Sequence, residues 1–262
     1  MPEKLNNLVM DDFIHPDDLS AVKALKKVPG AEKIVSFMED RNNQMIVRMS
    51  TLGNCIKLTG QNFPRVYGIV KDVCEIMGYE NMPEVYTRRG YEPDVIPSGV
   101  DKPVVVIPNY AIKNFGDDLL YFAVGRAVTR LKSGHLKFYA AAQIMVSVTG
   151  FFPVISDAVI LPLANWMRKS ELTADRGGLL VCQNYTAAMK FLMYKAGMPV
   201  KDSQNINIPE YIEACKSENK IANAGKGMKT LRNCTGWAND RIIELFTWHA
   251  KGQYDDLLEK YI

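Results

Sequence analysis

Histidine is scarce in this sequence, and paired cysteines are absent. The 262 residues include three histidines, His15, His135 and His249, and no two of them form a His-x-x-x-His pair. The five cysteines are odd in number and scattered, with no Cys-x-x-Cys. Two common zinc-ligand patterns are therefore missing. Scattered cysteines suit reduced thiols, so we expect a cytoplasmic protein.

The chain also lacks a strong excess of charge and an N-terminal targeting pattern. Lysine and arginine number 32 against 29 acidic residues, a net charge of +3. That excess is too small to predict binding to nucleic acid or to an anionic membrane surface. The first residues, MPEKLNNLVMDDF, have neither an apolar core nor a cleavage site, so no signal peptide is predicted.

One long run without charge, residues 138–156, complicates the expectation of a soluble protein. It reaches the length of a membrane span, about 18 apolar residues. However, the run contains Gln143 and Pro153, and Asp157 follows it at once. We favour a buried helix or hairpin, and contact with a membrane is the second interpretation.

The composition, 47% hydrophobic and 23% charged, is ordinary for a globular protein with a sizeable core. Residues 1–80 are typical of helices, with starts at His15-Pro16 and at Pro64. The remainder, residues 81–262, forms the second region, and we expect the two to pack as one compact unit. The pattern predicts a mostly α-helical α+β protein.

Short runs of β-branched and aromatic residues occupy positions 85–87, 95–96 and 104–107, and prolines separate them. Proline is tolerated at strand ends and sheet edges. The sequence therefore predicts a small antiparallel sheet with an exposed edge.

The stretch 117–135 has the features of an amphipathic helix. Asp117 and Asp118 suit its N-terminal end, and Ser133-Gly134 suits its stop. Arg126 and Arg130 lie four positions apart, which places them on one side of the helix. On spacing alone, both are surface residues.

Two stretches resemble one family. The predicted helix ends in Leu-Lys-Ser-Gly-His at 131–135, and a later stretch has Glu171 and, four positions on, Asp175 within Ala-Asp-Arg. In this order they resemble the active-site helices of gluzincin zinc metallopeptidases, the family of the heat-shock peptidase HtpX and the CAAX prenyl endopeptidase. The resemblance spans most of the chain. It implies a zincin-like core with an N-terminal helical region.

The same resemblance implies that the catalytic residues are missing. The family helix carries His-Glu-x-x-His, but Arg126 and Arg130 stand at the histidine positions and Ala127 at that of the general-base glutamate. Thr235 stands where the family has a histidine that binds the reacting carbonyl. Glu171 is the only zinc-ligand position that is kept.

Arginine stays protonated in proteins and offers no lone pair to a metal. We therefore expect no zinc, no other cofactor, and a catalytically inactive pseudopeptidase. We hypothesise that the guanidinium groups of Arg126 and Arg130 replace the charge of the metal, with Glu171 and Asp175 as their salt-bridge partners.

The former active-site cleft predicts a peptide or protein partner. In gluzincins the edge strand before the active-site helix pairs with the substrate by strand addition. That place is occupied by Val104, Val105, Val106 and Ile107. A purely structural strand fits these residues equally well. The sequence predicts no particular oligomeric state.

Two other functions are compatible with the pattern. Arginine pairs bind carboxylates and phosphates, so the chain could be an altered enzyme or an anion-binding protein. Residues 138–156 could instead attach a scaffold protein to a membrane surface.

Overall fold

The computed structural model describes residues 2–32, 36, 40–99, 101–134, 136–139, 157–200, 206–223 and 238–262. The helices are α1 (Met10–Phe13), α2 (Pro16–Lys26), α4 (Arg41–Leu52), α5 (Pro64–Ile76), α6 (Asn109–Asn114), α7 (Asp117–Lys132), α9 (Asp157–Cys182), α10 (Tyr185–Ala196), α11 (Ile208–Asn223), α13 (Ala238–Ala250) and α14 (Gln253–Tyr261). The strands are β1 (Cys55–Leu58), β2 (Glu84–Arg88), β3 (Ile96–Ser98) and β4 (Val104–Pro108). The predicted α+β class with mostly helix is confirmed.

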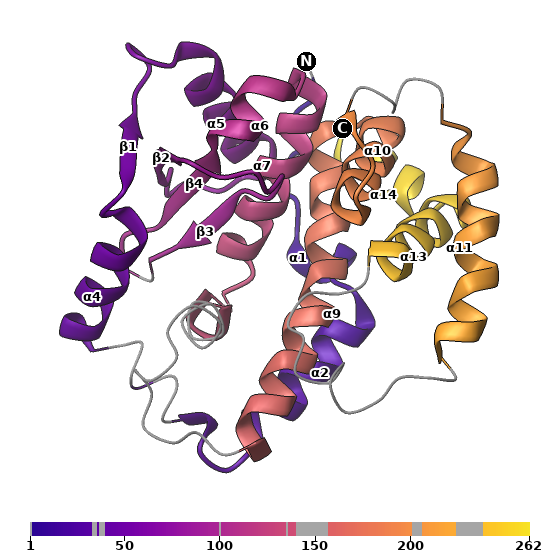
Figure 1. Cartoon of the computed structure of the whole chain (residues 1–262), viewed down its shortest axis with the longest axis horizontal. Coiled ribbons are helices and arrows are strands. Elements are labelled where there is room, and N and C mark those ends of the chain that lie inside the picture. The colour runs from indigo at the N-terminus through magenta and orange to yellow at the C-terminus, as the bar shows by residue number, and fades with distance from the viewer. Residues whose placement is uncertain are drawn as a thin grey trace.

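Helix α9 runs through the middle of the molecule, with elements on both sides of it (Figure 1). On one side α7 packs along α9, and α5 and the sheet pack beyond α7. On the other side lie α10, α11, α13 and α14, and α2 also packs against α9. The pair α7 and α9 therefore connects the sheet to the C-terminal helices.

The four strands form a mixed sheet in the order β1-β2-β4-β3. Strands β2 and β4 are parallel, whereas β1–β2 and β3–β4 are antiparallel. The prediction of a purely antiparallel sheet is therefore wrong. Strand β1 was not predicted either, because it is short and half exposed, yet it joins residues of the N-terminal region to the sheet.

The position predicted for the substrate-binding edge is also wrong. Strand β4 contains Val104, Val105, Val106 and Ile107, and it pairs with β2 on one side and β3 on the other. These four side chains are at most 1% exposed. A continuous apolar run is typical of an interior strand buried on both faces, which explains the error. The backbone of β4 is already paired on both sides.

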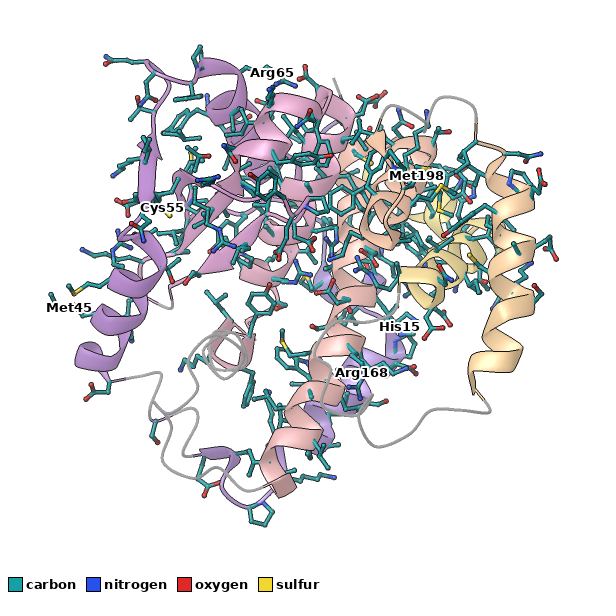
Figure 2. All side chains as sticks on the ribbon, in the orientation of Figure 1. His15, Met45, Cys55, Arg65, Arg168 and Met198 are labelled. Carbon is teal, nitrogen blue, oxygen red and sulfur yellow. The ribbon has the colours of Figure 1, made fainter. Side chains whose placement is uncertain are left out.

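Strands β1 and β3 form the edges of the sheet. On the β1 side, Ile56 is 65% exposed. Met45 of the neighbouring α4 projects away from the rest of the molecule, and it is 62% exposed (Figure 2). The β3 edge lies against α7 and contains Pro97, which has no N–H to donate. The exposed edge was expected within residues 82–107, and it lies at residues 55–58 instead.

Several predicted helix ends are confirmed. Helix α2 begins at Pro16, and Nδ1 of His15 accepts a hydrogen bond of 3.1 Å from the backbone N–H of Asp17. After α7, Gly134 has φ +70°, and after α10, Gly197 has φ +110°. Both values lie in the left-handed region that glycine enters without steric cost.

Glycines bring α7 and α9 unusually close together. A Cβ at Gly177 would lie 2.0 Å from Oγ1 of Thr129, and one at Gly178 would lie 2.7 Å from Cγ of Arg126. A Cβ at Gly125 of α7 would lie 2.8 Å from Cβ of Val181. No such contact is tolerated between real side chains, so these positions require glycine. The close approach of α7 and α9 brings the side chains of one helix within reach of those of the other.

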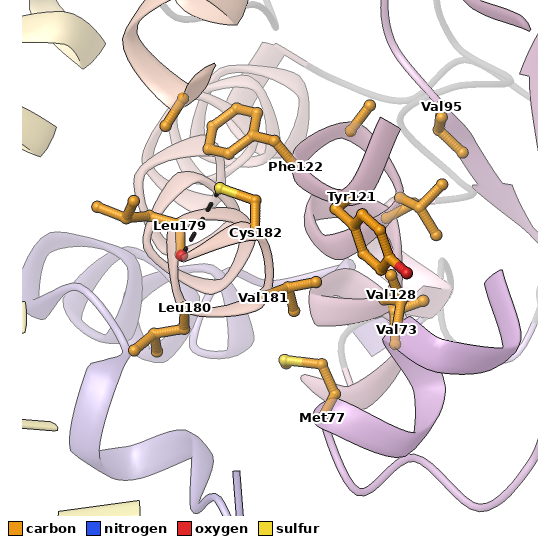
Figure 3. Close-up of a cluster of buried hydrophobic side chains, with 14 of the residues drawn as sticks. Val73, Met77, Val95, Tyr121, Phe122, Val128, Leu179, Leu180, Val181 and Cys182 are labelled. Carbon is orange, nitrogen blue, oxygen red and sulfur yellow. Dashed lines mark hydrogen bonds between the residues drawn. The ribbon is translucent and has the colours of Figure 1, made fainter. Parts of the chain in front are cut away.

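The hydrophobic core is built where α5, α7 and α9 meet (Figure 3). Val73 and Met77 come from α5 and the residue after it, and Phe122 and Val128 from α7. All four are completely buried. The stretch 179–182 of α9 completes the cluster, and Sγ of Cys182 contacts the carbonyl of Leu179 at 3.7 Å.

The N-terminal region is attached to α9 by a buried polar contact. Asp18 of α2 accepts hydrogen bonds from Nε1 of Trp166 at 2.9 Å and from Oγ1 of Thr173 at 2.6 Å. Burial raises the pKa of Asp18, and the two hydrogen bonds oppose that rise. The backbone N–H of His15 also donates to Oγ1 of Thr173, at 3.1 Å.

The apolar run 138–156 is described only at Phe138 and Tyr139, and residues 140–156 lie outside the described residues. The rings of Phe138 and Trp166 meet edge to face, with centroids 5.8 Å apart. No helix in the described part of the chain is long and apolar enough to span a membrane.

Candidate functional site: a buried arginine and carboxylate cluster

Arg126 and Arg130 both point from α7 into the interior. They are 1% and 6% exposed, whereas arginine is rarely buried unless it is paired. Glu171 and Asp175 project from the facing side of α9 and are 7% and 1% exposed. The structure thus brings together the four charged residues that the sequence analysis singled out.

Every nitrogen of the Arg126 guanidinium donates to a carboxylate. Nε donates to Oδ1 of Asp175 at 2.8 Å, and Nη2 donates to Oε2 of Glu171. Nη1 donates to Oδ1 of Asp94, a residue of the loop between β2 and β3. The guanidinium carbon also lies 5.3 Å from the centre of the Phe191 ring. Arg126 therefore joins α7, α9 and the loop.

Arg130 lies one turn later and shares the same glutamate. Its Nη2 donates to Oε1 of Glu171, and its guanidinium carbon lies 5.2 Å from the centre of the Tyr139 ring. Within the described residues, Nε of Arg130 is buried without a hydrogen-bond partner. The neighbouring cavity, lined by Arg130 and Asp18 among others, holds only about 10 Å³, which is room for a single water molecule.

A third arginine completes the cluster. Arg241 of α13 is 1% exposed. It binds Asp175 through two parallel hydrogen bonds, from Nε to Oδ2 at 2.7 Å and from Nη2 to Oδ1 at 2.6 Å. Its Nη1 lies 3.1 Å from Oε2 of Glu171. The resemblance to gluzincins matched Arg241 to a family arginine and used it only to locate Thr235, six positions earlier. Its contacts with Asp175 and Glu171 were not predicted, because α13 is far away in the chain.

Sequence reasoning also missed Asp94 and Lys195. Nζ of Lys195, in the last turn of α10, donates to Oδ2 of Asp94. Burial and the nearby Arg241 lower the pKa of Lys195 to about 7. Neither residue lies in a recognisable motif. The Gly177-Gly178 pair, which permits the close approach of α7 and α9, was the available signal that this helix packs tightly.

The charges of the cluster hold Glu171 in its ionised form. Burial alone would raise the pKa of Glu171, but Arg130, Arg241 and Arg126 lower it far below its usual range. In the same way, burial opposes the charge of Arg126, but Asp175 and Glu171 raise its pKa above the usual value. Mutual pairing therefore compensates the burial of these charges.

The positions at which the resemblance implies that catalytic groups are missing are only partly described. Ala127 is completely buried in α7, and its methyl group offers no proton acceptor. Thr235 and His135 lie outside the described residues.

Over nearly its whole length the chain is similar to plastoglobule-localized metallopeptidase 48, a chloroplastic protein of Arabidopsis thaliana. The two are 23% identical over 270 aligned positions, which cover 99% of this chain and 78% of the relative. The chain is metallopeptidase-like. No family model matches it, and no solved structure matches it.

The described residues of the cluster do not fit the zinc that a metallopeptidase-like chain implies. Zinc sites need three or four neutral or anionic ligands. Within the described ranges, no group of three or more His, Cys, Asp or Glu side chains is arranged to hold a metal. Both oxygens of Glu171 accept hydrogen bonds from guanidinium groups instead.

Proposed function

We propose that this metallopeptidase-like chain is a gluzincin homologue that has lost zinc catalysis and binds a peptide or protein partner instead of cleaving it. The observation that carries the proposal is the pairing of one glutamate, Glu171, with the two arginines that stand at the expected histidine positions, Arg126 and Arg130. This pairing joins residues that the motif resemblance singled out and that contact each other in the structure.

The chemistry of these residues supports the loss of catalysis. Zinc peptidases need an open coordination position for a water molecule and a nearby carboxylate that carries its proton. Arg126 and Arg130 supply positive charge without a coordination position, and Ala127 replaces the proton carrier. The cluster keeps α7 and α9 together by ion pairing, as a bound metal would.

The proposal of partner binding is based on the similarity to a metallopeptidase. The order of the strands limits where a peptide can bind by strand addition. Strand addition at Val104–Ile107 is excluded because β4 is an interior strand. The edge beside α7 is β3, whose Pro97 offers no N–H, so we place the peptide along β3 with few backbone hydrogen bonds.

The alternatives from the sequence have less support. All three guanidinium nitrogens of Arg126 donate hydrogen bonds to carboxylates of the chain. The cavity beside Arg130 has room for about one water molecule. Both observations disfavour binding of an anion between the two arginines. A membrane-peripheral role would use residues outside the described part of the chain. The cytoplasmic location stays a prediction, and the relative is named for chloroplast plastoglobules.

Metal content and peptidase assays test the proposal. We expect purified protein, dialysed against zinc-containing buffer, to retain well below about one zinc per chain, and to leave a mixed peptide library uncleaved. Stoichiometric zinc together with peptide hydrolysis would overturn it. Binding of library peptides, compared between wild type and Ile96→Asp on β3, tests the second half of the proposal independently of the metal.

A further inference from the structure

Asp94 differs from every other member of the charged cluster in where it comes from. Arg126, Arg130, Glu171, Asp175, Arg241 and Lys195 are held by helices, whereas Asp94 lies on the loop between β2 and β3. One of its oxygens accepts from Nη1 of Arg126 and the other from Nζ of Lys195. A single carboxylate therefore spans two cations that belong to α7 and α10.

Asp94 is also the member closest to solvent. Its side chain is 24% exposed, compared with 16% for Lys195 and 1% for Arg126. The next residue, Val95, is 1% exposed and lies among the core side chains in Figure 3. On the other side of Asp94 the loop is at the surface, and Tyr91 is 78% exposed. The loop is thus anchored after Asp94 and solvent-facing before it.

Withdrawal of Asp94 would leave an uncompensated positive site. Four cations would then face Glu171 and Asp175, with the charge of Glu92 also acting on Lys195, whereas Asp94 now binds two of the four. The remaining nitrogens of Arg126 are already used by Glu171 and Asp175. Only Nη1 of Arg126 and Nζ of Lys195 would lose their acceptor. Buried charged donors without an acceptor are strongly destabilising, so a replacement anion is favoured.

We propose that Nη1 of Arg126 and Nζ of Lys195 form a carboxylate-binding site, which the loop of residues 89–95 fills with its own Asp94 and which a free carboxylate, such as a peptide C-terminus, occupies in its place. Two donors on one planar acceptor match a monocarboxylate. The site is independent of the proposed function, because it holds whether or not a metal ever stood between α7 and α9.

Asp94→Ala empties the site and allows chemical rescue. We expect its melting temperature to rise saturably with formate or acetate, by about 3–5 °C at roughly 100 mM, and not with chloride at equal ionic strength. The measurement belongs at acidic pH, because the pKa of Lys195 is about 7 in the wild type and loss of the neighbouring Asp94 carboxylate lowers it further. N-acetylglycine mimics a peptide C-terminus, and its amide, N-acetylglycinamide, is the matched ligand without charge.

Two variants distinguish a built site from general salt effects. Asp94→Asn fills the space with an amide, so formate should not rescue it. Asp94→Ala combined with Lys195→Met removes one donor, and the formate response should fall by at least about half. An equal response of wild type, Asp94→Ala and Asp94→Asn to formate would overturn the proposal.

The wild-type protein provides a second measurement if Asp94→Ala does not fold. A tethered carboxylate competes at an effective concentration in the millimolar range. Titration with N-acetylglycine to several hundred millimolar should therefore shift the backbone amide resonances of residues 89–95 saturably, whereas N-acetylglycinamide should not. If both compounds act alike, Asp94 is a structural ion-pair partner only and the proposal fails.

Discussion

Glu171 accepts from Arg126 with one carboxylate oxygen and from Arg130 with the other. The two arginines are four residues apart on α7, so one turn of helix presents two cations to a single acid on α9. Two like charges so close would repel each other in a dry interior. The shared glutamate offsets that repulsion, which makes it the residue on which the cluster depends.

Glu171→Gln should therefore destabilise the protein strongly. The substitution keeps the size of the side chain but leaves Arg126, Arg130 and Arg241 with one carboxylate fewer. We expect the free energy of unfolding to fall by about 3–5 kcal/mol, measured by urea denaturation. Glu213→Gln is the matched control, because its pair with Lys216 is on the surface and should contribute less than about 1 kcal/mol. Similar effects of the two substitutions would contradict the cluster.

The stability that Glu171 provides should depend on pH in the acid range. Its pKa is lower in the folded protein than the usual value, so the unfolded chain binds its proton more readily. The contribution is then fully present above the unfolded pKa of about 4.3 and is lost as pH falls below it. We expect the difference in unfolding free energy between wild type and Glu171→Gln to narrow on acidification from neutral pH. A constant difference between pH 7 and the most acidic pH at which both proteins fold would count against ionised Glu171.

Gly177→Ala should disrupt the packing of α7 against α9. The new Cβ would collide with the side chain of Thr129, which itself donates a 2.8 Å hydrogen bond to the carbonyl of Gly125. We expect a loss of about 3 kcal/mol in thermal or urea unfolding. Gly68→Ala on α5 is the control, since nothing lies within 4 Å of its Cβ and alanine favours helix by about 0.5–1 kcal/mol. Stability unchanged by Gly177→Ala would show that the helices are farther apart.

Restoring the family motif tests whether Arg126 and Arg130 occupy the positions of metal ligands. The triple variant Arg126→His, Ala127→Glu and Arg130→His recreates His-Glu-x-x-His opposite Glu171. If the arginines occupy the metal position, this variant should gain about one zinc per chain, measured by elemental analysis of the dialysed protein. Adding Glu171→Gln removes the third ligand and should abolish most of the gain. Zinc uptake that ignores Glu171 would indicate a different site.

Local patterns predicted much of the backbone. Proline at position 16 and glycine at positions 134 and 197 place helix ends correctly because their steric limits act within a few residues. The interior strand β4 shows where this reasoning fails. Its apolar run was correctly predicted as a strand, but sheet order depends on pairing with residues about 20 positions away, and no local pattern records that.

The candidate site likewise has residues that the sequence indicated and residues that only the structure revealed. Spacing by itself placed Arg126 and Arg130 on one side of their helix, and Glu171 and Asp175 on one side of theirs. That the two pairs face each other was a hypothesis from the resemblance to gluzincins, and the structure shows the contact. Only the tertiary structure decided that Arg241, Asp94 and Lys195 join them. Each comes from a separate element, and burial of a charge is compensated by whichever opposite charges the packing of all the elements brings within a few ångströms.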